Sequence, residues 1–226
     1  MKTASFVKTD IFLYGTLFLA WALIMYFLNM NYAYFGKEFP SVSFEQQSPQ
    51  AIQKKLIDAI INSRIAMAAE KNREKQCRIA ASLGATYFQV FATSNNALYR
   101  DSAATFCLQA LQLDSTVGIV HYLLGEISLS KNNEANAVSF YEKESSEFAL
   151  HQLSKPSQGL YNSNDPTIRM AALYSNLRLA FLYSTSFVDS QKAQAKFNAY
   201  LALETDAQRK QASIQQIGKY WKTQPK

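Results

Sequence analysis

Apolar and polar positions divide the chain into two regions. Residues 11–30, IFLYGTLFLAWALIMYFLNM, form an uncharged apolar run. At about 1.5 Å of rise per residue, a helix of this length crosses the ~30 Å hydrocarbon core of a bilayer. After about residue 45 the apolar residues recur three and four positions apart among polar ones, which is the period of amphipathic helices. This pattern predicts one membrane span followed by an all-α domain.

The apolar run is predicted to be an uncleaved signal-anchor. A cleaved secretory signal, whose apolar core is usually shorter at about 7–15 residues, stays the alternative. The run holds no ionisable residue, so we expect no ion or proton path within it. The boundaries that we assign are residues 1–10 for a short tail, 11–31 for the transmembrane anchor, with Ile11, Trp21 and Met30 in the bilayer, and 32–47 for a linker.

Basic residues beside the anchor predict its orientation. Lys2 and Lys8 precede the apolar run, whereas Lys37 alone follows it closely. Because cytoplasmic flanks of membrane spans are enriched in Lys and Arg, we expect a cytoplasmic amino terminus and a helical domain on the far side. The expected setting is a single-pass protein of a bacterial inner membrane with a periplasmic domain. A mitochondrial inner membrane is the alternative.

Residues 48–226 are predicted to form one helical domain. Ser48 followed by Pro49 is typical of a helix start, and a first long helical region is expected from there to Thr93. Pro156, Gly159 and their polar neighbours mark a long loop over residues 154–165. Further helices are expected over residues 97–113, 116–130, 133–152, 166–184, 189–204 and 206–222.

A pattern of small residues repeats along this domain. Three predicted helices carry alanine four residues before a larger side chain, as Ala103-x3-Cys107, Ala137-x3-Tyr141 and Ala193-x3-Phe197. The helices before them carry Leu83-Gly84, Leu124-Gly125 and Leu179-Ala180. The first two alanines are 34 residues apart, and residues 118–150 match best. This spacing resembles the tetratricopeptide repeat (TPR), although His121 stands where that family favours Trp and the third alanine follows after 56 residues. An irregular helical bundle is the alternative.

The resemblance implies a TPR-like α-solenoid of antiparallel helix pairs, ended by a capping helix over residues 206–222. It also implies protein–protein interaction. We therefore expect a membrane-anchored scaffold or adaptor, an accessory or assembly subunit of a larger membrane complex such as a secretion or envelope machine. A periplasmic chaperone near a translocon and a supernumerary subunit of a respiratory or other energy-transducing complex are alternatives. The residues expected to face the partner are Tyr87, Tyr122, Glu126, Asn176 and Tyr183.

The net charge of +6 is concentrated in two stretches. Residues 54–78 carry seven basic and three acidic side chains, and residues 206–226 carry five and one, so each contributes +4. The first stretch fits either a docking face for an acidic partner or anionic lipid headgroups, or a solvated helix face. No motif that reads nucleic acid is present, so nucleic acid is not an expected partner.

No motif for catalysis was found. Phosphate-binding, dinucleotide-binding, zinc-protease and nucleophile-elbow sequences are absent. Cys77 and Cys107 are not spaced as metal ligands, and we interpret them as buried thiols or as a disulfide between adjacent antiparallel helices. Glu142, Glu144 and Glu147 are interpreted as a solvated helix face. We expect no enzyme activity, cofactor, metal or small-molecule substrate, with an unrecognised helical active site as the alternative.

Overall fold

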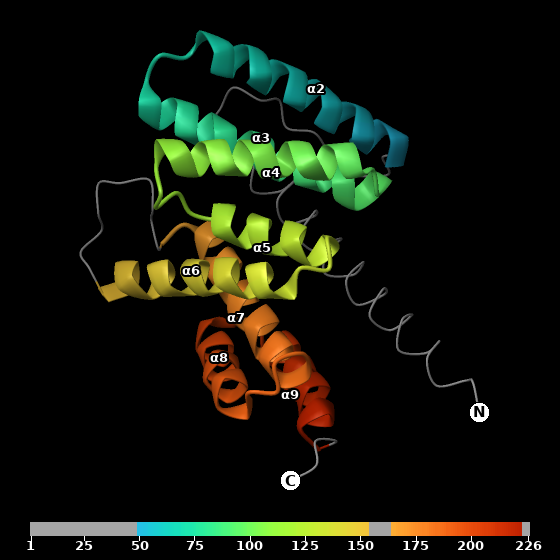
Figure 1. Ribbon diagram of the computed structural model, residues 1–226, viewed down its shortest axis with the longest axis vertical. Coiled ribbons are helices and arrows are strands. Elements are labelled where there is room, and N and C mark those ends of the chain that lie inside the picture. The colour runs from blue at the N-terminus through green and yellow to red at the C-terminus, as the bar shows by residue number, and fades with distance from the viewer. Residues whose placement is uncertain (1–48, 154–163, 223–226) are drawn as a thin grey trace.

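The computed structural model describes residues 49–153 and 164–222, and these residues form helices joined by short turns (Figure 1). The predicted tail, membrane anchor and linker, and most of the predicted long loop, lie outside the described residues. Among the described residues, no helix is both long and apolar enough to cross a bilayer. The eight described helices are α2 (Pro49–Ala69), α3 (Arg73–Ser94), α4 (Ala97–Leu113), α5 (Val120–Ser130), α6 (Glu134–Leu153), α7 (Pro166–Thr185), α8 (Ser190–Leu203) and α9 (Ala207–Lys222).

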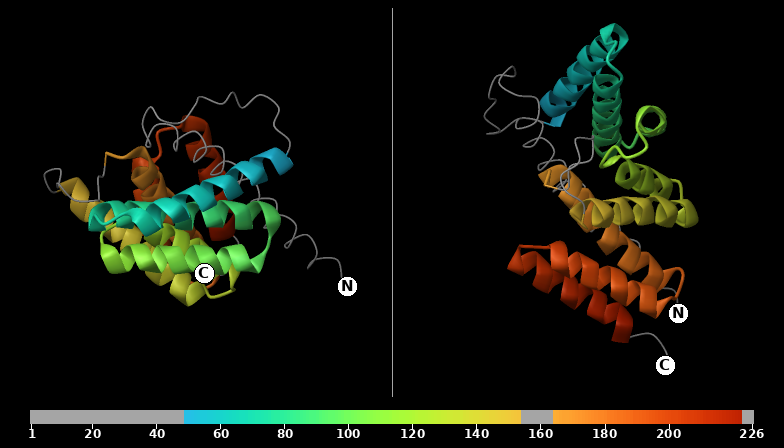
Figure 2. Two further views of the ribbon diagram at one scale, coloured as in Figure 1. Left: turned by 90° about the horizontal axis from the view of Figure 1, so that it is seen from above. Right: turned by 90° about the vertical axis from the view of Figure 1, so that its left-hand side faces the viewer.

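The helices pack mainly against their neighbours in sequence. The pairs α3–α4, α5–α6 and α7–α8 each pack closely, α2 packs on α3, and α9 packs on α7. The first helices of successive pairs also meet, α3 against α5 and α5 against α7. Figures 1 and 2 show the pairs following one another from α2 at one end of the molecule to α8 and α9 at the other. The predicted all-α class is confirmed, and the domain is repeat-like in its packing.

The first helical region, expected up to Thr93, consists of two helices, because the chain turns between α2 and α3. Glu70 Oε1 accepts hydrogen bonds from the backbone N–H groups of Lys71 and Asn72, at 2.9 and 2.8 Å. The Asn72 side chain then accepts from Lys75 N at 3.0 Å and caps α3. Short polar side chains that bond to nearby backbone in this way end one helix and start the next.

The start of α5 also differs from the prediction, which placed it at residue 116. The Asp114 side chain accepts hydrogen bonds from Thr116 N at 2.8 Å and from Thr116 Oγ1 at 2.7 Å, which holds a turn. Ile119 then adopts φ 72°, so the helix begins only at Val120. Left-handed backbone is costly for a β-branched residue, so surrounding contacts must hold Ile119 there.

The turn inside each of the three helix pairs has the same construction. A residue in left-handed conformation comes directly before the N-cap of the second helix. These residues are Asn95, Asn132 and Val188, with φ of 52°, 56° and 50°. The side chain of the next residue accepts a hydrogen bond from a backbone N–H of the new helix. Asn96 accepts from Leu98 N, Asn133 from Asn136 N and Asp189 from Lys192 N, at 3.0–3.1 Å. The same local device therefore closes all three pairs.

A second contact is found within both the first and the third pair, where it joins the two helices of the pair. Arg73 donates from Nε to the carbonyl of Leu113 at 3.0 Å, and Arg169 donates from Nη2 to the carbonyl of Leu203 at 3.1 Å. Each arginine lies 11 residues before the small residue of its first helix, Gly84 or Ala180. Each carbonyl belongs to the last residue of the second helix. An arginine near the carboxyl end of a helix satisfies carbonyls that have no partner within that helix.

Small residues let the two helices of a pair approach closely. A Cβ added at Gly84 would lie 2.6 Å from Cys107 Sγ, and one at Gly125 would overlap the Tyr141 ring, with Cδ1 at 2.7 Å. Ala103 and Ala137 are fully buried on the facing helices. The predicted small-residue positions therefore lie at the crossing points of the helices.

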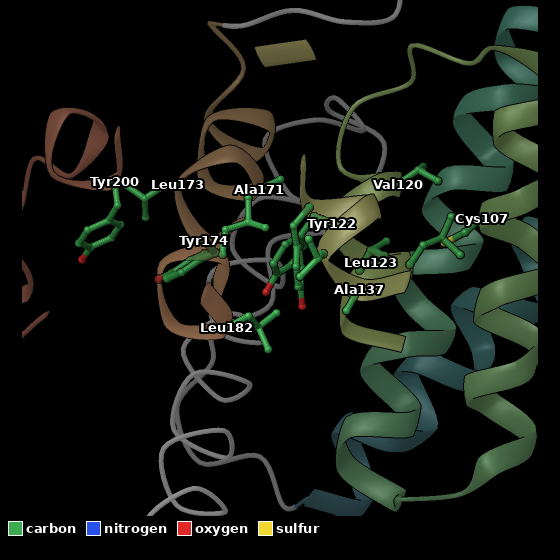
Figure 3. Close-up of a cluster of buried hydrophobic side chains, with 14 of the residues drawn as sticks. Cys107, Val120, Tyr122, Leu123, Ala137, Ala171, Leu173, Tyr174, Leu182 and Tyr200 are labelled. Atoms are coloured by element: carbon green, nitrogen blue, oxygen red, sulfur yellow. The ribbon is translucent and has the colours of Figure 1, made fainter. Parts of the chain in front are cut away.

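A continuous core joins the three pairs. Figure 3 shows Tyr122 of α5 with Ala171 and Tyr174 of α7 on one side and Leu123 of its own helix on the other. At the carboxyl end, Ile217 of α9 is buried in this core, and Tyr200 and Ser213 share a hydrogen bond of 2.9 Å that links α8 to α9. Helix α9 thus covers the end of the stack, at the place predicted for the capping helix.

Candidate functional site

The polar side chains that the sequence singled out meet mostly between the second and third helix pairs. Arg178 of α7 reaches Glu126 of α5 with two hydrogen bonds, Nε to Oε1 at 2.8 Å and Nη2 to Oε2 at 3.0 Å. Tyr141 of α6 donates its hydroxyl to the same carboxylate at 2.7 Å. The Arg178 and Glu126 side chains are only 17 % and 12 % exposed. A bidentate pair in this setting fixes the relative position of three helices.

The electrostatics of this pair keep Arg178 charged. Burial alone would lower the pKa of Arg178, but the Glu126 carboxylate outweighs burial and the pKa lies above its ordinary value. Burial, with Glu126 nearby, raises the pKa of Tyr122 and Tyr141 well above the ordinary value, so both phenols stay neutral. These shifts favour a permanent structural link over a group that exchanges protons near neutral pH.

Asn176 belongs to a second polar link, between α6, α7 and α8. Its Nδ2 donates to the carbonyl of Ala172 at 2.9 Å, and its Oδ1 accepts from Ser145 Oγ at 2.9 Å. Lys196 of α8 donates to Ser145 Oγ at 3.2 Å. Burial lowers the pKa of Lys196, while nearby Glu142 acts in the opposite direction. The predicted partner residue Asn176 therefore has its hydrogen bonds satisfied within the domain.

Tyr183 lies at the edge of the same region. Its hydroxyl donates to Glu142 Oε1 at 2.6 Å, and Lys192 Nζ lies 5.2 Å from its ring centroid. The Phe187 ring meets the Tyr183 ring edge-on at 6.1 Å, and Phe187 itself is 44 % exposed. Burial and the carboxylate of Glu142 raise the pKa of Tyr183. This corner presents an aromatic residue next to exposed charge.

The interpretation of Glu144 as a solvated residue is wrong, because its side chain is fully buried. The carboxylate accepts from Ile119 N at 3.4 Å and Tyr122 N at 3.3 Å, so it caps the amino end of α5 from another helix. Burial raises its pKa to about 7, opposed by His121 and by the two backbone N–H groups. His121 Nε2 lies 3.5 Å from Glu147 Oε1, and its Nδ1 has no hydrogen-bond partner among the described residues.

Tyr87 of α3 lies apart from these residues, in the apolar cluster that α2, α3 and α4 share. Its ring stacks on Phe106 of α4 at 5.4 Å and lies 6.3 Å from Tyr99, and it is 7 % exposed. Cys77 and Cys107 are free and buried in the same α3–α4 pair. Burial raises the thiol pKa of Cys77 to about 11 and of Cys107 to about 12, which makes both weak nucleophiles.

The structure thus brings together Tyr122, Glu126, Asn176 and Tyr183, and leaves Tyr87 with α4. Sequence reasoning missed Arg178 and the burial of Glu144. The sequence did hold a signal for the Glu126–Arg178 pair. Arg178 stands between two leucines in an apolar stretch of α7, and Glu126 is the one carboxylate of the strongly apolar α5. Isolated opposite charges in two apolar helices are typical of a buried pair. Across the described ranges, no cluster of His, Cys, Asp and Glu is arranged to hold a metal ion.

Comparisons with known proteins gave no match: no family model, no curated protein and no solved structure is similar to this chain. Its assignment therefore comes from its own contacts. It is an all-α, repeat-like domain whose described residues form eight helices that pack mostly as sequential neighbours.

Proposed function

We propose that this chain is a membrane-anchored adaptor in which a TPR-like stack of helix pairs holds a segment of a partner protein. The observation that carries the proposal is the recurrence of the same turn and cap in all three pairs, together with the arginine-to-carbonyl contact of the first and third. Repeated helix pairs build an extended surface, which suits the binding of another polypeptide.

The first helices of the pairs supply the surface that we assign to the partner. They retain apolar side chains that are only partly covered by the core. These are Ala85 and Phe88 on α3, Leu129 on α5 and Leu177 on α7. A partner segment with apolar side chains at helical spacing would bury them, and the Arg178–Glu126 pair beside Leu177 would stay fixed during binding.

The apolar run at residues 11–30 supports the membrane half of the proposal. A membrane tether raises the effective concentration of the domain near a partner in the same membrane. Binding therefore becomes tighter without any new contact. An adaptor of this kind acts through position rather than chemistry, in agreement with the raised pKa values of Tyr122 and Tyr141 and with the hydrogen bonds that hold Asn176 inside the domain.

Site-specific photocrosslinking in the full-length protein tests the proposal. Benzoylphenylalanine replaces Phe88 or Leu177 on the first helices, and Leu98 or Leu108 on α4 serves as the matched control because these are 73 % and 49 % exposed. After purification in mild detergent, we expect one discrete set of crosslinked proteins from positions 88 and 177 and none from the controls.

Other outcomes separate the alternatives. Crosslinks from the control positions alone would contradict the assigned surface. A broad smear of unrelated nascent or unfolded chains would favour the periplasmic chaperone over the adaptor. A single respiratory complex at fixed stoichiometry would identify the chain as a supernumerary subunit.

A further inference from the structure

We propose that the outward face of α2 rests on an anionic bilayer surface and so sets the angle at which the domain stands on the membrane. The inference depends on the membrane anchor of the proposed function. Helix α2 lies at the end of the stack, and its main neighbour among the described residues is α3 (Figures 1 and 2). One side of α2 packs inward through Leu56 and Ile60, which are each 6 % exposed.

The opposite side of α2 carries large apolar residues in solvent. Ile61 is 52 % exposed and Ile65 is 65 % exposed, one helical turn apart. Lys54 lies on the same face, seven residues before Ile61, since seven residues are close to two turns. Ala68 and Ala69 extend the exposed surface to the end of the helix without a charge. An interfacial helix presents such an apolar strip to the boundary between headgroups and acyl chains.

Cations flank this strip on both sides. At about 100° per residue, Lys55 and Arg64 fall on opposite edges of the face that holds Ile61 and Ile65. Lys54, Lys55 and Arg64 are exposed, and none of them forms an ion pair with another described residue. Asp58, the single carboxylate of α2, is exposed and lies on the same face, seven residues before Ile65. The three cations and the one carboxylate leave α2 with an excess of two positive charges, which favours an anionic leaflet over a neutral one.

The position of α2 in the chain selects lipid over an acidic protein as the occupant. Residues 31–48 are the only ones between the end of the apolar run and Pro49. Eighteen residues span at most about 60 Å when fully extended, so the start of α2 stays within that distance of the predicted span, and α2 is the first described helix after it. A surface that is always within reach needs little intrinsic affinity to stay occupied.

The test uses the full-length protein reconstituted in vesicles. Ile65→Cys carries an environment-sensitive fluorophore, and Leu98→Cys on α4 is the control at similar exposure; the native thiols are buried and resist labelling. We expect a blue shift at position 65 in phosphatidylcholine vesicles that contain phosphatidylglycerol, and none at position 98. The shift should be lost in pure phosphatidylcholine and in high salt, because salt screens exposed charges.

Charge reversal gives the second arm. The triple variant Lys54→Glu, Lys55→Glu and Arg64→Glu should lose the blue shift, whereas Lys143→Glu and Lys210→Glu on α6 and α9 should keep it. An unchanged signal in the triple variant, or an equal signal in both lipids, overturns the inference. So does a shift seen in native membranes but not in vesicles, which would assign the face to an acidic protein.

Flotation after a carbonate wash is measured in the same samples. Vesicles that carry the protein without a shift at position 65 overturn the role of α2 and leave the anchor intact. Loss of the protein from the vesicles overturns the anchor itself.

Discussion

The Glu126–Arg178 ion pair joins the second helix pair to the third. The loss of unfolding free energy when this ion pair is broken tests that role at the scale of single residues. Glu126→Gln removes the charge that Arg178 and Tyr141 both contact. The guanidinium would remain largely buried without a counter-charge. Because breaking one side of a buried pair is costly, we expect about 3 kcal/mol lower free energy of unfolding. Urea denaturation measures it.

An exposed pair provides the control. Glu74→Gln breaks the contact between Arg78 and Glu74, whose side chains are 44 % and 58 % exposed. Surface pairs of this spacing contribute little, so a loss of about 0.5 kcal/mol or less is expected. Equal losses in the two variants would contradict the structural role given to Arg178.

Glu144 makes the stability of the domain depend on pH. Its pKa rises from 4.5 to about 7 on folding, so the folded protein holds a proton that the unfolded chain releases between these values. The stabilisation is therefore complete below pH 4.5 and is lost as pH rises through 7. At about 1.4 kcal/mol per pKa unit, the contribution is about 3 kcal/mol.

Glu144→Gln keeps the size of the side chain and an oxygen that accepts from Tyr122 N. We expect the variant to lose less stability than the wild type between pH 5 and pH 8, as measured by urea denaturation at each pH. His121 and Glu147, which face this carboxylate, remain in both proteins, so the difference between the curves isolates Glu144. Parallel curves would contradict the burial of an ionisable Glu144.

At the scale of the helical elements, Gly125→Ala tests the close approach of α5 and α6. An added Cβ would overlap the Tyr141 ring, and that ring cannot swing aside because its hydroxyl is bonded to Glu126. We expect the free energy of unfolding to fall by about 1–3 kcal/mol through overpacking. Gly218→Ala in α9 has nothing within 4 Å of the new Cβ, so it should stabilise by about 0.5–1 kcal/mol.

The turn between α7 and α8 gives a prediction of the opposite sign. Val188 occupies the left-handed position that asparagine fills in the other two pairs, and it is 66 % exposed. Because asparagine tolerates this conformation better than a β-branched residue, Val188→Asn should raise the free energy of unfolding by about 0.5–1 kcal/mol. The reverse change, Asn132→Val, should lower it. Thermal unfolding of both variants checks the pair.

The sequence allowed much of this architecture to be predicted, for a physical reason. Gly84, Gly125 and their facing alanines fix where helices cross, and such contacts depend on local spacing. The break at Glu70 was missed because a polar residue that bonds to nearby backbone has the same periodicity as one on a solvated helix face. The burial of Glu144 was missed because its partners lie on another helix, 22 and 25 residues away.

At the scale of the whole molecule, the orientation in the membrane is open to direct test. The Lys2 and Lys8 flank predicts a cytoplasmic amino terminus and a domain on the periplasmic side. With protease added to intact spheroplasts, a tag at the carboxyl terminus should be lost while a tag at the amino terminus survives. Protection of both tags, released only by detergent, would contradict this orientation.

The order of the helices in space has a mechanical consequence. Helix α2, which follows the apolar run, and helix α9 lie at opposite ends of the stack (Figure 1). A pulling force between the bilayer and a protein gripped at α7 would therefore load the interfaces from α2 to α7 in series. The α4–α5 junction, which packs less extensively than the helices within each pair, would yield before the pairs themselves. The domain would then lengthen stepwise under tension and keep each hairpin intact.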